Sequence, residues 1–146
     1  MFRKILLAYD GSDHAEAALA TAAGLSNALG ADLHVVHTPQ LDTPPVVLGP
    51  YVSQLGTPPT QAEYDAVGAK MIERVRTAAD AHGVRVKGAH VGHGAPADYI
   101  LATAKDIDAD LIVMGRRGLG AVKALVLGSI SHAVAHRATC ACLTVV

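Results

Sequence analysis

Short apolar runs alternate with helix-periodic segments along most of this chain of 146 residues. Runs of strand length occupy residues 2–9, 33–37, 84–91, 110–114 and 143–146. In most of the segments between them, apolar residues recur at three- and four-residue spacing, which indicates amphipathic helices. Strands that alternate with helices form a parallel sheet with helices on both faces and right-handed crossovers. The sequence therefore predicts an open, five-stranded α/β sheet.

Capping residues indicate where two of the helices begin and end. Asp13 followed by Glu16 resembles a capping box, and Gly30 can supply the left-handed residue that ends the same helix. Thr60 followed by Glu63 is a second capping box, and this helix is expected to stop near residues 82–83.

Two shorter helices are predicted in the second half of the chain. The first has Pro96 in its first turn and runs to about Lys105. The second is capped by Ser129 and runs to about His136. Residues 39–59, by contrast, hold six of the seven prolines and are predicted to be a long loop.

The composition is that of one globular domain spanning residues 1–146. Hydrophobic residues make up 51% of the chain and aromatic residues only 3%, so the core must be built from aliphatic side chains. The first apolar run is interrupted by Asp10 and is too short for a signal peptide or a membrane span, which favours a cytoplasmic protein. Cys140 and Cys142 fit neither a disulfide framework nor a zinc site and are expected to be buried free thiols.

Charge is distributed unevenly along the chain. Residues 1–110 carry 8 Lys and Arg against 13 Asp and Glu, whereas residues 111–146 carry four basic residues and no acidic one. A nucleic-acid surface would usually be more basic and interleaved with aromatic residues, and no aromatic residue follows Tyr99. A small anionic ligand fits the local positive charge better.

A cluster of glycines follows the fourth predicted strand. The stretch LIVMGRRGLGAVKALVLGSIS places them at positions 115, 118, 120 and 128. In a sheet of order 3-2-1-4-5, the direction reverses between the first and fourth strands, and ligands bind at that point. The first amides of the helix that begins at residues 128–129 have no internal partner and favour an anion. The sequence therefore predicts a phosphate site, with glycines that only cap and turn as the alternative.

Two familiar phosphate motifs do not account for this pattern. The G-x-x-x-x-G-K-[ST] motif of P-loop proteins is absent from the sequence. Residues 92–97 match the G-x-G-x-x-[GA] pattern but follow the third strand, at the edge of the predicted sheet. Turn glycines explain that match better than a dinucleotide site.

The same residues resemble those of the universal stress protein family. Gly115-x2-Gly118-x9-Gly128-Ser129 is similar to the ATP-binding signature of that family, and residues 5–12 resemble its first strand and acidic turn. The likeness spans essentially the whole chain. It implies a Rossmann-like fold of the adenine nucleotide alpha hydrolase type, with strand order 3-2-1-4-5, and homodimers formed through the last strand.

The resemblance also implies a ligand, ATP or its products ADP and AMP, and a role for individual residues. Asp10 would meet the ribose or a metal ion, Mg²⁺ or Mn²⁺, held mostly by phosphate oxygens, and Thr38 would lie near adenine. Met114 and Gly115 would line the nucleoside. The candidate phosphate-binding residues are Gly118, Gly128, Ser129 and Ile130, and the candidate set also includes Ala8, Tyr9 and Arg117.

Structural alternatives exist for several polar residues. Asp10 precedes Gly-Ser and could serve only as a turn residue. Arg116 and Arg117 could screen phosphate charge or be two solvated side chains of a loop. His132 and His136 lie one helical turn apart but have no evident third metal ligand, and His37 is expected to be a packed polar residue.

Three functions are consistent with these features. We favour a stress-response switch in which ATP orders residues 39–59 and 116–127 and changes a dimer surface or the surface for a regulated protein partner. A slow ATP hydrolase or nucleotidyl-transferring enzyme is the second, although residues 111–146 supply no carboxylate for the metal ions that phosphoryl transfer needs. A nucleotide-free interaction module is the third.

Overall fold

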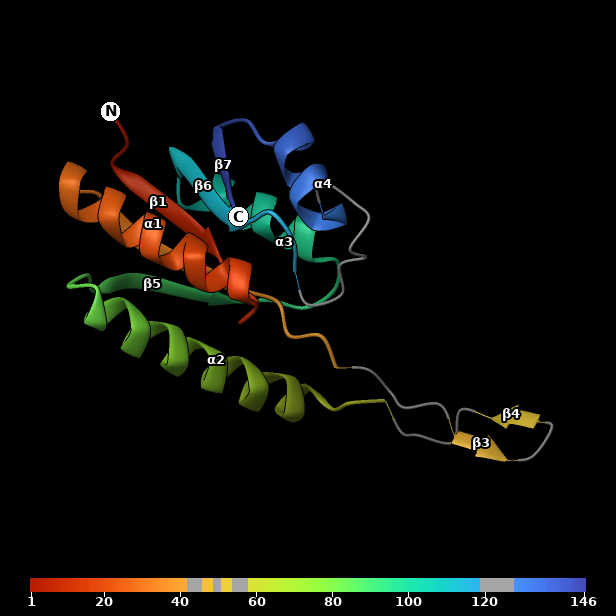
Figure 1. The fold of residues 1–146 in the computed structure, drawn as a ribbon. Helices are drawn as coiled ribbons and strands as arrows, with labels where there is room; N and C mark the ends of the chain where they lie inside the picture. The colour runs from red at the N-terminus through yellow and green to blue at the C-terminus, as the bar shows by residue number, and fades with distance from the viewer. Residues whose placement is uncertain (42–45, 49–50, 54–57, 119–127) are drawn as a thin grey trace.

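The computed structural model describes residues 1–41, 46–48, 51–53, 58–118 and 128–146, with backbone alone for 46–48 and 51–53. Its helices and strands are shown in Figure 1. In chain order they are β1 Lys4–Ala8, α1 Asp13–Leu29, β2 Asp32–His37, β3 Val46–Leu48, β4 Tyr51–Ser53, α2 Gln61–Ala81, β5 Val86–Val91, α3 Pro96–Asp106, β6 Leu111–Gly115, α4 Ser129–Arg137 and β7 Ala141–Val145.

Five of the strands form the predicted parallel sheet. Its order is β5-β2-β1-β6-β7, and every neighbouring pair is parallel. The expected order 3-2-1-4-5 is therefore confirmed. The first and third of these strands begin two residues later than expected, at Lys4 and Val86, and the last begins two residues earlier, at Ala141.

The predicted loop at residues 39–59 contains a second, smaller sheet. β3 pairs antiparallel with β4, with Val47 opposite Val52. The rest of this segment, at residues 42–45, 49–50 and 54–57, lies outside the described residues. The prediction of a segment without strands is thus wrong for residues 46–48 and 51–53, which include the β-branched residues Val46, Val47 and Val52.

Alternate residues of each central strand enter two different hydrophobic cores. Ile5 and Leu7 of β1 pack with α1 and α2 on one face of the sheet. Leu6 of the same strand packs with Ile100 of α3 and Val134 of α4 on the other. Both faces of the central strands are therefore buried, which is why these strands are continuous apolar runs.

Two of the predicted helix ends are confirmed. Gly30 ends α1 with φ 64, in the left-handed region. At the start of α2, the Thr60 side chain accepts from the Glu63 N–H while the Glu63 carboxylate accepts from the Thr60 N–H. This reciprocal pair is the predicted capping box.

Two predicted caps are wrong by one residue. Ser12 caps α1, accepting the Ala15 N–H at 3.2 Å, and Asp13 is the first helical residue. Gly11 has φ 80, and this turn leaves Ser12 extended at the cap position. The N-cap of α4 is likewise Gly128, whose backbone is extended, so that Ser129 is the first residue of the helix.

No helix in the described part of the chain is long and apolar enough to cross a membrane.

The capping box of α2 can be tested by a single substitution. Thr60→Ala removes the side-chain acceptor, and we expect a loss of about 1 kcal/mol in the free energy of unfolding. Urea denaturation followed by circular dichroism measures it. Thr77→Ala is the matched control, because Thr77 is exposed in the same helix and its hydroxyl donates only to the Glu73 carbonyl. Equal stability losses in the two variants would contradict the capping role.

Candidate functional site

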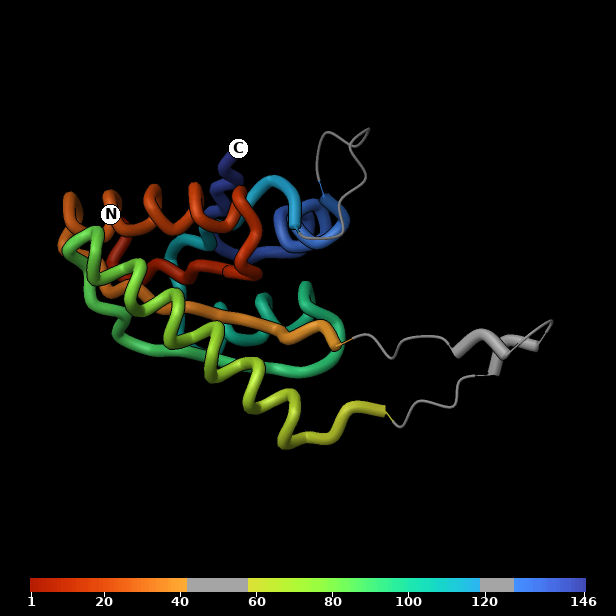
Figure 2. The backbone as a smooth tube through the Cα atoms, turned by 60° about the horizontal axis from the view of Figure 1, so that its bottom comes forward, coloured from red at the N-terminus to blue at the C-terminus, as the bar shows by residue number. Residues whose placement is uncertain are grey.

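The carboxyl ends of β1 and β6 lie side by side where the strand order reverses. The register places Ala8 opposite Met114. The chain leaves β1 through α1 toward β2 on one side, and leaves β6 through α4 toward β7 on the other. The two turns and the start of α4 therefore lie at the same end of the molecule (Figure 2). Open α/β sheets bind ligands at this position, and we call the region between the two turns the crevice.

Asp10 and Gly118 meet across this crevice. A Cβ atom built on Gly118 would lie 2.6 Å from Asp10 Oδ2. The carboxylate from the β1 turn is thus packed against the backbone of the β6 turn, and a side chain at residue 118 would displace it. Two residues that are 108 positions apart in the sequence, and that the sequence assigns to one site, are brought together.

Asp10 also shapes its own turn. Its Oδ1 accepts the Ser12 N–H at 3.0 Å, which is the local contact expected of an Asp before Gly-Ser. The other carboxylate oxygen is the one that lies beside Gly118. The turn role and the position beside Gly118 are therefore both present.

Side chains from α1 and α2 brace this turn. The Tyr9 hydroxyl donates to Glu16 Oε1, and Arg74 donates to the same oxygen at 2.5 Å. The Arg74 guanidinium also lies 5.9 Å from the centre of the Tyr9 ring and donates to the Gly11 carbonyl at 3.4 Å. Burial and the bond to Glu16 raise the pKa of Tyr9, so its hydroxyl stays a donor at neutral pH.

The β6 side of the crevice is closely packed. A Cβ on Gly115 would lie 2.7 Å from the His14 Cβ and 2.9 Å from the His14 carbonyl carbon. The close approach that requires glycine here is therefore that of α1. Met114 is 3% exposed and its side chain packs in the core with Ile100 of α3 and Val134 of α4.

A hydrogen-bonded clamp joins the β6 turn to the start of α4. The Arg116 carbonyl accepts from the Gly128 N–H at 2.8 Å and from the Ser131 hydroxyl at 2.8 Å. The Gly128 amide, expected to face phosphate, is thus engaged within the protein. Ser129 and Ile130 are exposed first-turn residues of α4, whose amides have no intrahelical acceptor. Of the first-turn amides of α4, those of Ser129 and Ile130 belong to exposed residues, whereas Ser131 is buried.

Arg116 and Arg117 are more buried than solvated loop side chains. Both residues are partly buried, and the Nε atom of each is fully buried with no hydrogen-bond partner among the described residues. A buried guanidinium N–H without an acceptor is costly. An anionic ligand beside these side chains would offset that cost.

The end of β2 contributes Thr38 and His37. Thr38 is partly buried and directly follows the strand. His37 is 6% exposed, and its Nδ1 donates to the Tyr9 carbonyl at 2.8 Å. Burial lowers the pKa of His37, against the opposing effects of this hydrogen bond and of the Asp10 charge. His37 is therefore a packed, neutral side chain that ties β2 to the turn after β1, as expected.

The residues described by the structure include no group of three or more His, Cys, Asp or Glu side chains arranged to hold a metal ion. Asp10 is the one carboxylate that the candidate residues contribute to the crevice. A metal ion bound here would thus take most of its ligands from the nucleotide phosphates and from water.

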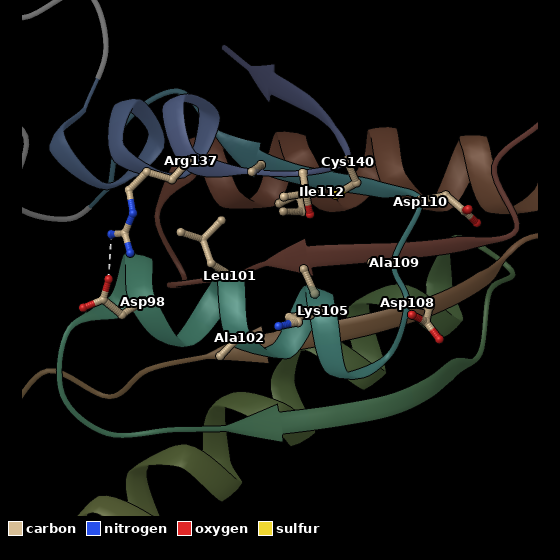
Figure 3. A pocket seen from close by; sticks show the side chains of 13 residues that line it. Asp98, Leu101, Ala102, Lys105, Asp108, Ala109, Asp110, Ile112, Arg137 and Cys140 are labelled. Atoms are coloured by element: carbon tan, nitrogen blue, oxygen red, sulfur yellow. Dashed lines mark hydrogen bonds and ion pairs between the residues drawn. The ribbon is translucent and has the colours of Figure 1, made fainter.

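A hollow in the described residues lies elsewhere. It has a volume of about 570 Å³ and sits between α3 and the connection from α4 to β7 (Figure 3). Its walls include Lys105, Asp110 and Cys140, and Arg137 donates to Asp98 across its rim at 2.6 Å. Asp110 and Cys140 precede β6 and β7, so this hollow extends to the amino ends of those strands. None of the sequence-predicted site residues lines it.

Comparison with known proteins identifies the family and the fold. The model of the universal stress protein family matches residues 1–145. The chain belongs to this family. A universal stress protein from Thermus aquaticus is 44% identical to it over 148 residues, which cover 99% of each chain.

Solved universal stress protein structures share the architecture. One, in complex with cAMP, has a TM-score of 0.72 and 23% sequence identity, and the match covers 99% of this chain and 96% of the other. A universal stress protein from Archaeoglobus fulgidus in complex with dAMP has a TM-score of 0.69 at 20% identity, covering 100% and 98%. At these identities the likeness establishes the Rossmann-like fold.

The buried His37 of this universal stress protein predicts a pH-dependent stability. The unfolded chain takes up a proton on this residue near pH 6.5, whereas the folded protein resists protonation. The folded state therefore loses stability as the pH falls below about 6.5. His37→Asn should reduce the fall in melting temperature between pH 7 and pH 5. Leu33→Ala, a core truncation in the same strand, should lower the melting temperature at both pH values and leave the difference unchanged.

Proposed function

We propose that this universal stress protein binds ATP in the crevice between β1 and β6 and acts as a nucleotide-dependent regulatory switch. The observation that carries the proposal is the contact of the Asp10 carboxylate with Gly118 at the point where the strand order reverses. It places a hydrogen-bond acceptor beside the backbone of a glycine, where a larger residue would displace that acceptor. A ribose hydroxyl can donate to that carboxylate.

The phosphates would lie toward the start of α4. The amides of Ser129 and Ile130 and the positive end of the helix dipole favour an anion there. The guanidinium groups of Arg116 and Arg117, whose Nε atoms have no hydrogen-bond partner among the described residues, add positive charge from the turn after β6. Mg²⁺ or Mn²⁺ would be bound mainly by phosphate oxygens, with Asp10 as its candidate protein ligand.

The adenine base would lie near Thr38, at the end of β2. The cAMP and dAMP complexes of the structural neighbours support an adenine nucleotide as the ligand class. The adenine and the ribose would be bordered by the backbones of four candidate residues, Ala8, Tyr9, Met114 and Gly115.

A switch needs a surface that responds to the ligand. β7 is an edge strand of the sheet, and Leu143 and Val146 beside that edge are 36% and 67% exposed. Its position supports a homodimer formed through β7, because an edge strand presents unpaired backbone groups to another chain. The α4 helix joins the nucleotide crevice to this strand.

Gly118→Val tests the crevice directly. Gly118 does not have a left-handed φ, so valine acts through its side chain, which would displace the Asp10 carboxylate. We expect the dissociation constant for Mg-ATP to rise at least about tenfold, equivalent to about 1.4 kcal/mol, by isothermal titration calorimetry.

Gly24→Ala is the matched control for this variant. Gly24 lies in α1, and a Cβ built on it meets no atom within 4 Å, so ATP affinity should stay at the wild-type value. Unchanged ATP affinity in Gly118→Val, with its melting temperature preserved, would contradict the proposed site.

A further inference from the structure

Two histidines face each other on neighbouring strands, away from the nucleotide crevice. His34 lies in β2 and His90 in β5. His34 Nδ1 is 3.5 Å from His90 Nε2, and the two rings are nearly parallel, at 18°. The register pairs His34 with Gly88 and Val36 with His90, so the two histidines are diagonal neighbours on one face of the sheet.

The distance between the two nitrogens suits a shared metal ion. Imidazole nitrogens bind Zn²⁺ at about 2.0 to 2.1 Å, which places two such ligands of a tetrahedral ion roughly 3.3 Å apart. The observed 3.5 Å is close to that value. In a neutral imidazole, one ring nitrogen carries a proton and the other carries a free lone pair. A change of tautomer can place that lone pair on the nitrogen that faces the ion, so both rings can bind the ion and stay neutral.

Gly88 leaves space beside both nitrogens. A Cβ at this position would lie 2.5 Å from His34 Nδ1 and 3.3 Å from His90 Nε2. Glycine inside a strand weakens the strand and often marks a point where another group approaches closely. The absence of a side chain here allows the His34 ring to lean toward His90 and keeps the region between the nitrogens open.

Access and chemistry favour a transition metal over Mg²⁺. Both rings are only partly buried, so an ion can enter from solvent, and water can complete its coordination. Imidazole is a ligand for Zn²⁺, Cu²⁺ and Ni²⁺, whereas Mg²⁺ prefers oxygen. In the described part of the chain no third protein ligand joins the pair, so the ion would keep open coordination positions.

We propose that His34 and His90 form a two-histidine site for Zn²⁺ or a similar divalent transition-metal ion, with Gly88 providing the room for it. The ion cross-links β2 to β5. The site is separate from the proposed nucleotide function and does not depend on it.

A second histidine pair must be removed before the site is tested. His132 and His136 are exposed on α4, with ring centres 6.3 Å apart, and lie one helical turn from each other. The host protein is therefore the full untagged chain carrying His132→Gln and His136→Gln. Calorimetric titration of this host with ZnCl₂ should show one Zn²⁺ bound per chain.

Three variants of the host locate the ligands. His34→Gln and His90→Gln should each weaken Zn²⁺ binding at least about tenfold. Gly88→Ala keeps both histidines but places a methyl group beside their nitrogens, and it should weaken binding by a similar factor. His82→Gln removes an exposed histidine at the end of α2 and should leave binding unchanged.

Nitrogen chemical shifts identify the atoms involved. On addition of ZnCl₂, ¹⁵N spectra of the imidazoles should show coordination through Nδ1 of His34 and Nε2 of His90. Absence of Zn²⁺ binding by the host, or binding that persists in both His34→Gln and His90→Gln, would overturn the proposal. If Gly88→Ala does not fold, as judged by its circular dichroism, the two glutamine variants and the spectra still decide.

Discussion

The parallel pairing of β1 with β6 is the constraint on which the rest of the structure depends. Ile5, Leu6 and Leu7 of β1 are 0% exposed and enter the cores on both faces of the sheet, so the register of this strand cannot slip without reversing its faces. The same register sets Ala8 opposite Met114 and thereby starts two turns at one edge. The contact between Asp10 and Gly118 therefore follows from the packing of the β1 side chains in the two cores, which fixes where both turns begin.

Periodicity and local capping chemistry were sufficient to predict most of the fold. Short, two-sided apolar strands and intervening amphipathic helices determine the class of sheet, and residues such as Gly30 and Thr60 end or begin helices through contacts within a few positions. The meeting of Asp10 with Gly118 followed from strand order and from the family resemblance together. Local rules were wrong by one residue at the start of α1, because the left-handed turn at Gly11 makes Ser12 the cap in place of Asp13.

Other interactions between distant segments left no signal in the sequence. Arg74 reaches the β1 turn from α2, 58 residues from its partner Glu16, and nothing in its neighbourhood marks it. The same holds for His34 and His90, which become neighbours only through the β2–β5 register. The family resemblance assigns Gly115 to the nucleoside. The sequence gives no sign that the backbone of His14 lies against this glycine, because a close approach between distant segments leaves no local pattern.

The central claim is that a nucleotide binds at the carboxyl ends of β1 and β6, and amide chemical shifts measured during an ATP titration test it most directly. The account predicts large shifts for Asp10, Gly118, Ser129 and Ile130, together with the N–H of Thr38. Amides around the hollow between α3 and the α4–β7 connection should stay in place. Shifts confined to that hollow, or none at saturating Mg-ATP, would contradict the account.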